Sequence, residues 1–192
     1  MSGKCWYNIS AVNSLSDNWK LPEYPKSGNY GIWKYRAIEV FNKEWLNSMS
    51  DIGIDIVSAM VFYRGPYMGT KGAHVDVGTI EPLNIVKFGF NWIIGGRGSK
   101  MLWYERPKGD LKVLYTPANT PYIQWLDTDL KEIDSTTMES SPTLVKVDVP
   151  HKVSMGPAPR WCISARPRLE SSITWDEAVE NLRSKKLLVE RP

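Results

Sequence analysis

Short runs of β-branched and aromatic residues, each stopped by a turn, set the strongest constraint on how this chain can fold. The clearest runs lie at 54–63, 84–94, 100–105, 144–149 and 160–166, and shorter ones lie at 30–35, 72–77 and 111–115. Runs of this length and composition predict β-strands. Because few helical segments separate them, we expect an antiparallel sandwich or barrel rather than a parallel sheet.

Two segments carry a helical pattern instead. In residues 37–49 the apolar side chains recur three or four positions apart, so they would share one face of a helix that ends near Gly53. Residues 175–185 predict a second helix, with Thr174 as its N-cap. The turn-rich residues 1–29 predict an irregular arm that packs on the domain.

The length of 192 residues predicts one domain, because a single core usually forms from about 150 residues. Residues 1–53 would form an N-terminal arm and helix. Residues 54–167 would form the β core, and residues 168–192 a C-terminal helix and tail.

The composition excludes several classes of protein. Nine tryptophans and nine tyrosines are too many aromatic residues for a disordered chain, and a net charge of +3 does not argue for a DNA-binding surface. Cys5 and Cys162 are too few for a disulfide framework or a four-cysteine zinc site. The N-terminus has no apolar signal core, and no apolar run reaches the ~20 residues that span a bilayer. We therefore expect a cytoplasmic protein with no membrane partner.

Both histidines of the chain stand where a site could form. His74 and Asp76 are two residues apart in a predicted strand, so their side chains would point to the same side. His151 follows another predicted strand and could add a second imidazole. Two imidazoles and one carboxylate leave coordination positions open, which is the arrangement of non-haem Fe(II) oxygenases. Taken alone, His74 could equally be a hydrogen-bonded or surface histidine.

A predicted strand after His151 carries a polar face. Alternation places Arg160, Cys162, Ser164 and Arg166 on one side of the strand. Two arginines separated by small residues would suit a pocket wall that binds a carboxylate. The alternative is an exposed sheet face with solvated arginines. Arg166 could contact a substrate or pair with an acid on the surface.

The predicted strand at 84–94 offers a further contact. Lys87 and Asn91 share a face there, and burying them is costly unless a partner satisfies them. A bound oxoacid would do so, and Asn91 is the better candidate. Otherwise this face meets solvent and the opposite face, with Phe88, Phe90 and Trp92, forms the core.

Two further regions could border a substrate. Trp103 and Tyr104 could line a substrate cavity or simply belong to the core. Residues 106–143 form a long excursion that could act as a lid at the mouth of a barrel, or form a surface hairpin.

The ordered set His74-Val75-Asp76, His151 and Arg160 resembles the signature of Fe(II)- and 2-oxoglutarate-dependent dioxygenases. It is most similar in style to the small prolyl-hydroxylase-like members and to phage or marine-bacterial members, and it covers roughly residues 54–167. The resemblance implies a double-stranded β-helix, that is, a jelly roll or cupin-like barrel with a few flanking helices. It assigns His74, Asp76 and His151 to Fe(II), and Arg160 to the distal carboxylate of 2-oxoglutarate, with O2 as the oxidant.

The resemblance also implies a hydroxylase, whose first candidate substrate is an amino acid, free or in a peptide. Oxidation of a nucleobase by the same chemistry is the alternative. The basic residues 183–186 would permit nucleic acid, although a basic last turn more often complements a helix dipole.

Two other classes remain open. A jelly-roll enzyme with zinc or nickel, hydrolytic or isomerising, would use the same three ligands but give Arg160 no role. A non-enzymatic β-sandwich that serves as a binding or structural module would leave both histidines without a functional role.

Overall fold

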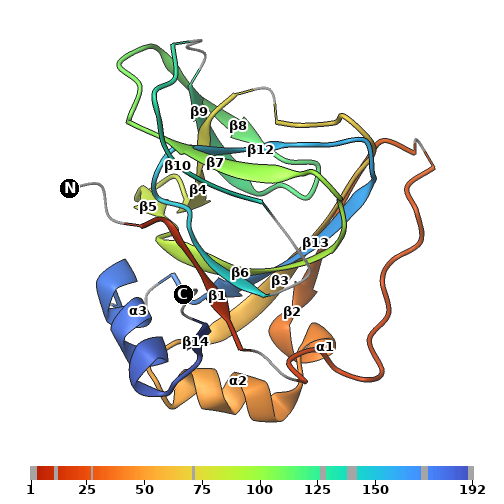
Figure 1. Ribbon diagram of the computed structural model, residues 1–192, viewed down its shortest axis with the longest axis vertical. Helices are drawn as coiled ribbons and strands as arrows, with labels where there is room; N and C mark the ends of the chain where they lie inside the picture. The colour runs from red at the N-terminus through yellow and green to blue at the C-terminus, as the bar shows by residue number, and fades with distance from the viewer. Residues whose placement is uncertain are drawn as a thin grey trace.

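The computed structural model describes residues 4–10, 13–26, 28–70, 72–125, 129–137, 142–169 and 173–189. These residues form two antiparallel sheets (Figure 1). The first sheet follows the order β14 (Leu188–Val189), β1 (Trp6–Ile9), β11 (Thr143–Lys146), β6 (Phe88–Gly95), β13 (Arg160–Pro167), β3 (Ile56–Arg64) and β2 (Tyr30–Arg36). The second follows the order β10 (Glu132–Thr137), β7 (Lys100–Tyr104), β12 (His151–Ser154), β4 (His74–Thr79), β9 (Pro121–Trp125) and β8 (Leu111–Tyr115), with β5 (Asn84–Ile85) paired to β4.

The chain passes repeatedly from one sheet to the other. β3 lies in the first sheet and β4 in the second, and the same crossing separates β6 from β7, β11 from β12, and β12 from β13. Four central strands of the first sheet, β11-β6-β13-β3, therefore face β10-β7-β12-β4 of the second. This interleaving is jelly-roll topology, so the expected mainly-β, cupin-like class is confirmed.

The alternation of side chains along β13 divides the interior in two. Trp161, Ile163 and Ala165 point to the outer side of the first sheet and join the largest hydrophobic core there. The opposite face of β13 carries its polar residues and looks toward the second sheet. A smaller core, which includes Ile93 and Trp103, joins the two sheets beside it.

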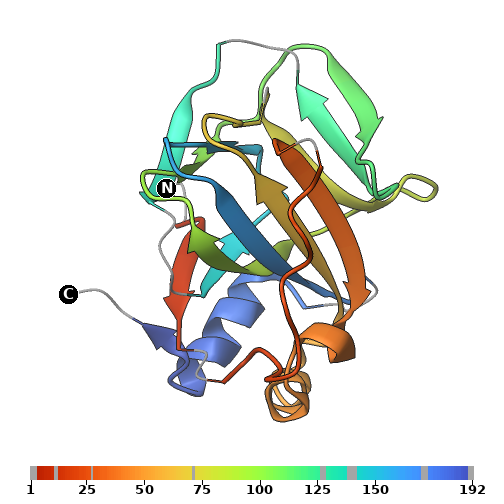
Figure 2. The same ribbon diagram turned by 90° about the vertical axis from the view of Figure 1, so that its right-hand side faces the viewer.

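Three helices cover the outer side of the first sheet: α1 (Ala37–Val40), α2 (Lys43–Ser50) and α3 (Trp175–Ser184) (Figures 1 and 2). Trp45 of α2 packs against Trp92 of the sheet, with 5.3 Å between ring centroids. Buried aromatic pairs of this kind add stabilisation beyond their area. The helices thus pack on the outer face of the first sheet, and its inner face is turned toward the second sheet.

The single helix expected at 37–49 is instead two short helices. Phe41 adopts an extended conformation between them, and the side chain of Asn42 accepts a hydrogen bond from the Glu44 amide at 2.7 Å, which starts α2. Asparagine favours such caps because its side chain competes with helical backbone bonds. The apolar residues keep their spacing on both sides of Phe41, so each of the two helices still buries one of its faces.

Three other sequence expectations need correction. Residues 1–29 are not wholly irregular, since Trp6–Ile9 forms β1 between β11 and β14. The run at 84–94 is divided into β5 and β6, and the run at 144–149 is a strand only as far as Lys146. Among the described residues, no helix is both long and apolar enough to cross a membrane.

The start of α3 provides a stability test. Thr174 accepts a hydrogen bond from the Glu177 amide at 3.2 Å, and the Glu177 carboxylate accepts one from the Thr174 amide at 2.7 Å. Thr174→Ala should lower the free energy of unfolding by about 1 kcal/mol, measured by urea denaturation. Ser184→Ala at the other end of α3 is the matched control and should change little. Equal effects of the two variants would contradict the capping role.

Candidate active site

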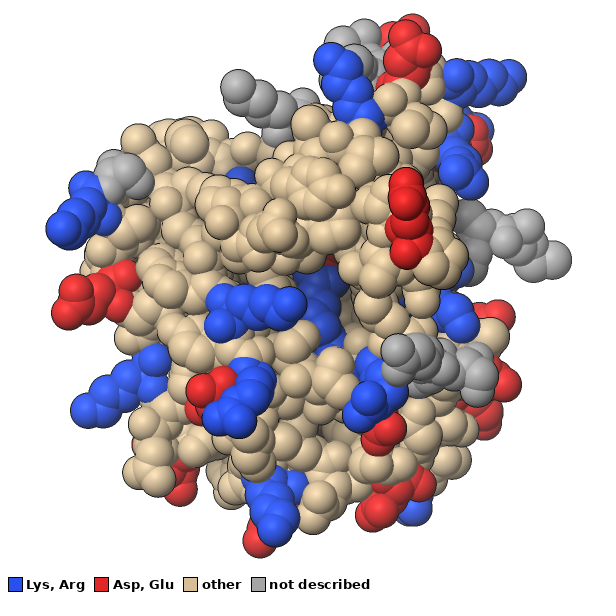
Figure 3. Space-filling model, turned by 180° about the vertical axis from the view of Figure 1, so that it is seen from behind, with Lys and Arg blue, Asp and Glu red and all other residues tan. Residues whose placement is uncertain are grey.

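A cavity of about 740 Å³ lies between the two sheets. Strands β3, β6 and β13 form one wall, and β4, β9 and β12 form the other. From behind, the molecular surface is hollowed near its centre, and basic side chains show within the hollow (Figure 3). A cavity of this size suits a small organic ligand.

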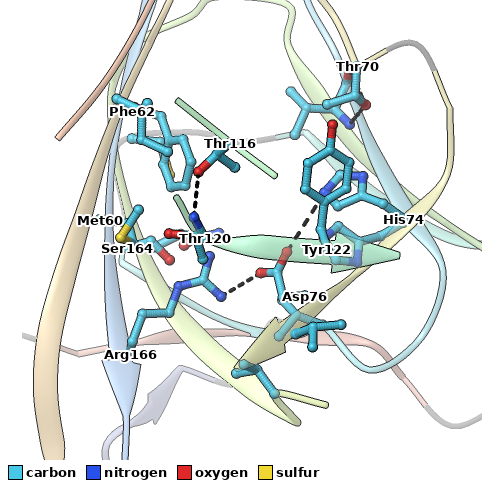
Figure 4. Close-up of a pocket in the computed structure, with 18 of the residues that line it drawn as sticks. Met60, Phe62, Thr70, His74, Asp76, Thr116, Thr120, Tyr122, Ser164 and Arg166 are labelled. Atoms are coloured by element: carbon cyan, nitrogen blue, oxygen red, sulfur yellow. Dashed lines mark hydrogen bonds and ion pairs between the residues drawn. The ribbon is translucent and has the colours of Figure 1, made fainter. Parts of the chain in front are cut away.

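Strand pairing brings the three expected ligands together. His74 and Asp76 point into the cavity from β4, while Val75 and Val77 between and beyond them are buried in a separate core. His151 begins β12 and is the register partner of His74. One ligand atom from each of the three residues lies within 4.8 Å of the others. The predicted two-histidine, one-carboxylate cluster is therefore present as a geometric arrangement, and Figure 4 shows His74 and Asp76 of this cluster.

Hydrogen bonding orients the His151 ring. Its Nδ1 lies 2.9 Å from the Val149 carbonyl oxygen, which can only accept, so Nδ1 carries the proton. Nε2 is then the lone-pair nitrogen. Ligating histidines usually have their second nitrogen fixed in this way.

Burial keeps both imidazoles neutral. Burial first, and then the neighbouring His151, lower the pKa of His74 to about 3, although Asp76 acts in the opposite direction. Burial also lowers the pKa of His151, partly opposed by Asp76. Neutral imidazole is the form that binds metals, so the cavity holds both rings ready to ligate.

Arg166 holds the carboxylate of Asp76. Its Nη1 lies 2.5 Å from Asp76 Oδ2, and Asp76 Oδ1 lies 3.8 Å from His74 Nε2. Burial alone would raise the pKa of Asp76, but Arg166 and the two imidazoles outweigh it and hold that pKa at about 2. Arg166 does pair with an acid, as one expectation held. The acid is Asp76 within the cavity, however, and not a residue of the surface.

Arg160 reaches the cavity from the start of β13 without a partner for two of its nitrogens. The residue is 3% exposed, and Nε and Nη1 have no hydrogen-bond partner. Asn91 on β6 also lines the cavity, and its buried Oδ1 is unpaired. A buried guanidinium without a counter-charge is costly, so the cavity around Arg160 is suited to an anion.

Two expectations about the walls need correction. Trp103 is fully buried in the core between the sheets and donates from its indole nitrogen to the Lys146 carbonyl at 2.7 Å, and it does not line the cavity. Lys87 lies outside the cavity as well, and its Nζ donates to the Ile173 carbonyl. On β6, Asn91 lines the cavity, whereas Phe88 and Phe90 join the core on the other side of the sheet.

The excursion at 106–143 does contribute to the site. It contains the hairpin β8–β9, which pairs with β4 and supplies Thr116, Thr120 and Tyr122 to the cavity wall (Figure 4). The ring of Tyr122 stands edge-on to His74, with centroids 5.7 Å apart. The described part of the excursion therefore contains a hairpin that borders the cavity and the strand β10, which pairs with β7. Its motion as a lid remains a prediction.

Sequence reasoning missed several polar cavity residues that could bind a ligand, among them Arg64 and Tyr122. Because side chains alternate along β3, Arg64 shares a face with Met60 and Phe62, and this face lines the cavity. No comparable signal marked Tyr122, because the hairpin's pairing with β4 is not visible in a single sequence.

No family model matches this chain, and no curated protein does. Three solved structures of YcfD from Escherichia coli, two of them described as a ribosomal oxygenase, resemble it with TM-scores of 0.34, 0.30 and 0.29. They share 15%, 14% and 14% identity and match 74%, 78% and 74% of this chain, which spans 42%, 33% and 40% of theirs. At these TM-scores the similarity supports no conclusion about function, which must come from the residues of the cavity.

The lowered pKa of His74 predicts a pH-dependent stability. In the unfolded chain the imidazole titrates near pH 6.5, whereas in the fold its pKa is about 3, so the unfolded state binds more protons between these values. The metal-free protein should therefore lose about 2 kcal/mol of stability from this residue between pH 7 and pH 5. Urea denaturation in the presence of a chelator would measure it. His74→Gln should flatten this dependence, and an unchanged slope would rule out a buried neutral His74.

Proposed function

We propose that this chain is a non-haem Fe(II) oxygenase that couples decarboxylation of 2-oxoglutarate to hydroxylation of a substrate. One observation carries the proposal. His74, Asp76 and His151 converge within 4.8 Å in the same cavity that contains the buried, unpartnered Arg160. The first feature suits a metal and the second suits the carboxylate of a cosubstrate.

The donor set fits the metal. Two neutral imidazoles and one carboxylate on one side of an ion leave positions open for other ligands, as in Fe(II) oxygenases. With O2, the bound metal and 2-oxoglutarate supply oxidative decarboxylation, in which one oxygen atom enters a substrate C–H bond and the other enters succinate as CO2 leaves. Asp76 would bind through Oδ1, because Arg166 already engages Oδ2.

The cosubstrate would be bound by residues of the first sheet. Arg160 would pair with its distal carboxylate, and this charge-assisted contact gains strength from the low exposure of the site. Asn91 would contribute a side-chain amide from the adjacent strand β6. The apolar side chains of Met60, Phe62 and Met101 line the same space and would exclude water during the reaction.

An amino acid, free or in a peptide, is the first candidate for the hydroxylated substrate, and a nucleobase is the second. A zinc or nickel enzyme with the same three ligands would not need Arg160. The burial of Arg160 without a partner therefore favours the oxygenase over a zinc or nickel enzyme and over a non-enzymatic module.

Anaerobic titration with Fe(II) and 2-oxoglutarate tests the proposal. The wild-type protein should develop a metal-to-ligand charge-transfer band that neither component gives alone. Arg160→Met should weaken 2-oxoglutarate binding about 10- to 100-fold and leave Fe(II) binding intact, because it removes a charged hydrogen bond but no metal ligand. His151→Ala should lose both.

The exposed Arg97 allows a matched control, since it lies outside the cavity. Arg97→Met should behave as the wild type does. Absence of the band in the wild type, or equal losses in Arg160→Met and His151→Ala, would count against the oxygenase.

A further inference from the structure

A second arginine without an acidic partner lies beside Arg160. Arg64, at the end of β3, is the register partner of Arg160 on β13, and both line the cavity. Among the described residues, its one hydrogen bond runs from Nη1 to the Met68 carbonyl at 3.3 Å, and no acidic side chain forms an ion pair with it. Two adjacent guanidinium groups repel each other unless an anion lies between or beside them.

Two tyrosines accompany Arg64. Tyr30 is its register partner on β2, and the Arg64 guanidinium lies 5.1 Å from the centre of the Tyr30 ring. Tyr122 lines the same cavity from β9. We call Tyr30, Arg64 and Tyr122 the arginine–tyrosine cluster. It offers guanidinium and phenol donors beside His74, against which Tyr122 packs.

Charge balance shows that one anionic cosubstrate would not neutralise this cavity. Among the described residues that line it, Lys34, Arg64, Arg160 and Arg166 are basic, and Asp76 is the one acid. Asp76 already pairs with Arg166. A divalent cation and a dicarboxylate cosubstrate cancel each other in charge, so the cavity keeps a net positive charge equal to that of Arg160, Arg64 and the exposed Lys34. A cavity of one sign attracts ligands of the opposite sign.

We infer that the arginine–tyrosine cluster binds a carboxylate or phosphate group of the hydroxylated substrate, which is an anion without a free amino group. The inference rests on the proposed function, because it distinguishes this substrate from the cosubstrate. A free ammonium group would find no unpaired acid among the described cavity residues. An amino acid substrate would therefore have its amino group blocked, as in an acylated or peptide-linked residue.

The two arginines differ in a way that assigns them to different ligands. Arg160 is 3% exposed and has two unpartnered nitrogens, as expected for the inner end of the cavity. Arg64 is only partly buried and lies next to Tyr30. The more buried Arg160 thus suits the cosubstrate, and the less buried Arg64 suits the substrate.

Calorimetric titration of the anaerobic Fe(II)–2-oxoglutarate complex tests the inference with four matched probes: phenylacetate, phenyl phosphate, phenylacetamide and phenethylamine. At least one acid should bind about tenfold or more tightly than the amide and the amine. The stronger of the two acids then tells whether the substrate group is a carboxylate or a phosphate. Arg64→Met should abolish the preference for acids and leave 2-oxoglutarate affinity within about threefold. Arg64→Lys should retain part of the preference, and Arg97→Met should retain all of it.

Two results would overturn the inference. One is an acid that binds no better than the amide. The other is an Arg64→Met variant that folds, by its thermal transition, yet loses 2-oxoglutarate as Arg160→Met does, since Arg64 would then belong to the cosubstrate site. Repeating the acid titrations on metal-free protein separates the two proposals. If the iron complex does not form but an acid preference that depends on Arg64 persists, the oxygenase fails and the anion site stands.

Discussion

One cross-strand pair, His74 opposite His151 where β4 meets β12, sets the geometry on which the rest of the site depends. Directly opposed residues of antiparallel strands lie about 5 Å apart, so the backbone itself holds the two imidazoles together. Asp76 shares their side because it is two residues from His74. The ligands are therefore arranged before any metal binds. A register slip of one residue would turn Val75 into the cavity instead and destroy the cluster.

Strand β13 serves both the core and the site. Its outer face binds the sheet to the helices through residues such as Trp161, and its inner face carries an arginine near each end. Arg160 and Arg166 are six residues apart, or about 20 Å along an extended strand. Asp76 neutralises Arg166, whereas Arg160 has no such partner. The charge of Arg166 is therefore balanced, whereas Arg160 keeps its positive charge beside Arg64.

Local rules were enough to predict part of this arrangement. Alternation alone put Asp76 with His74 and put Arg160 on one face with Ser164 and Arg166. The capping role of Thr174 followed from its place before a helix. Trp103 shows the limit of such rules. Alternation tells which side chains share a face of a strand, but it does not tell which face packs in the core. Arg64 shows the second limit. Its position beside Arg160 comes from the pairing of strands about 100 residues apart, which one sequence does not reveal.

The hairpin β8–β9 is joined to the second sheet only through β4, and β8 is the outermost strand. It adds Tyr122 to the wall but none of the three clustered side chains His74, Asp76 and His151. Under the proposed function, substrate recognition and metal ligation would thus be carried by separate stretches of chain. Such a hairpin could then change in length or sequence under selection for a new substrate, while the strands that carry the cluster stay the same.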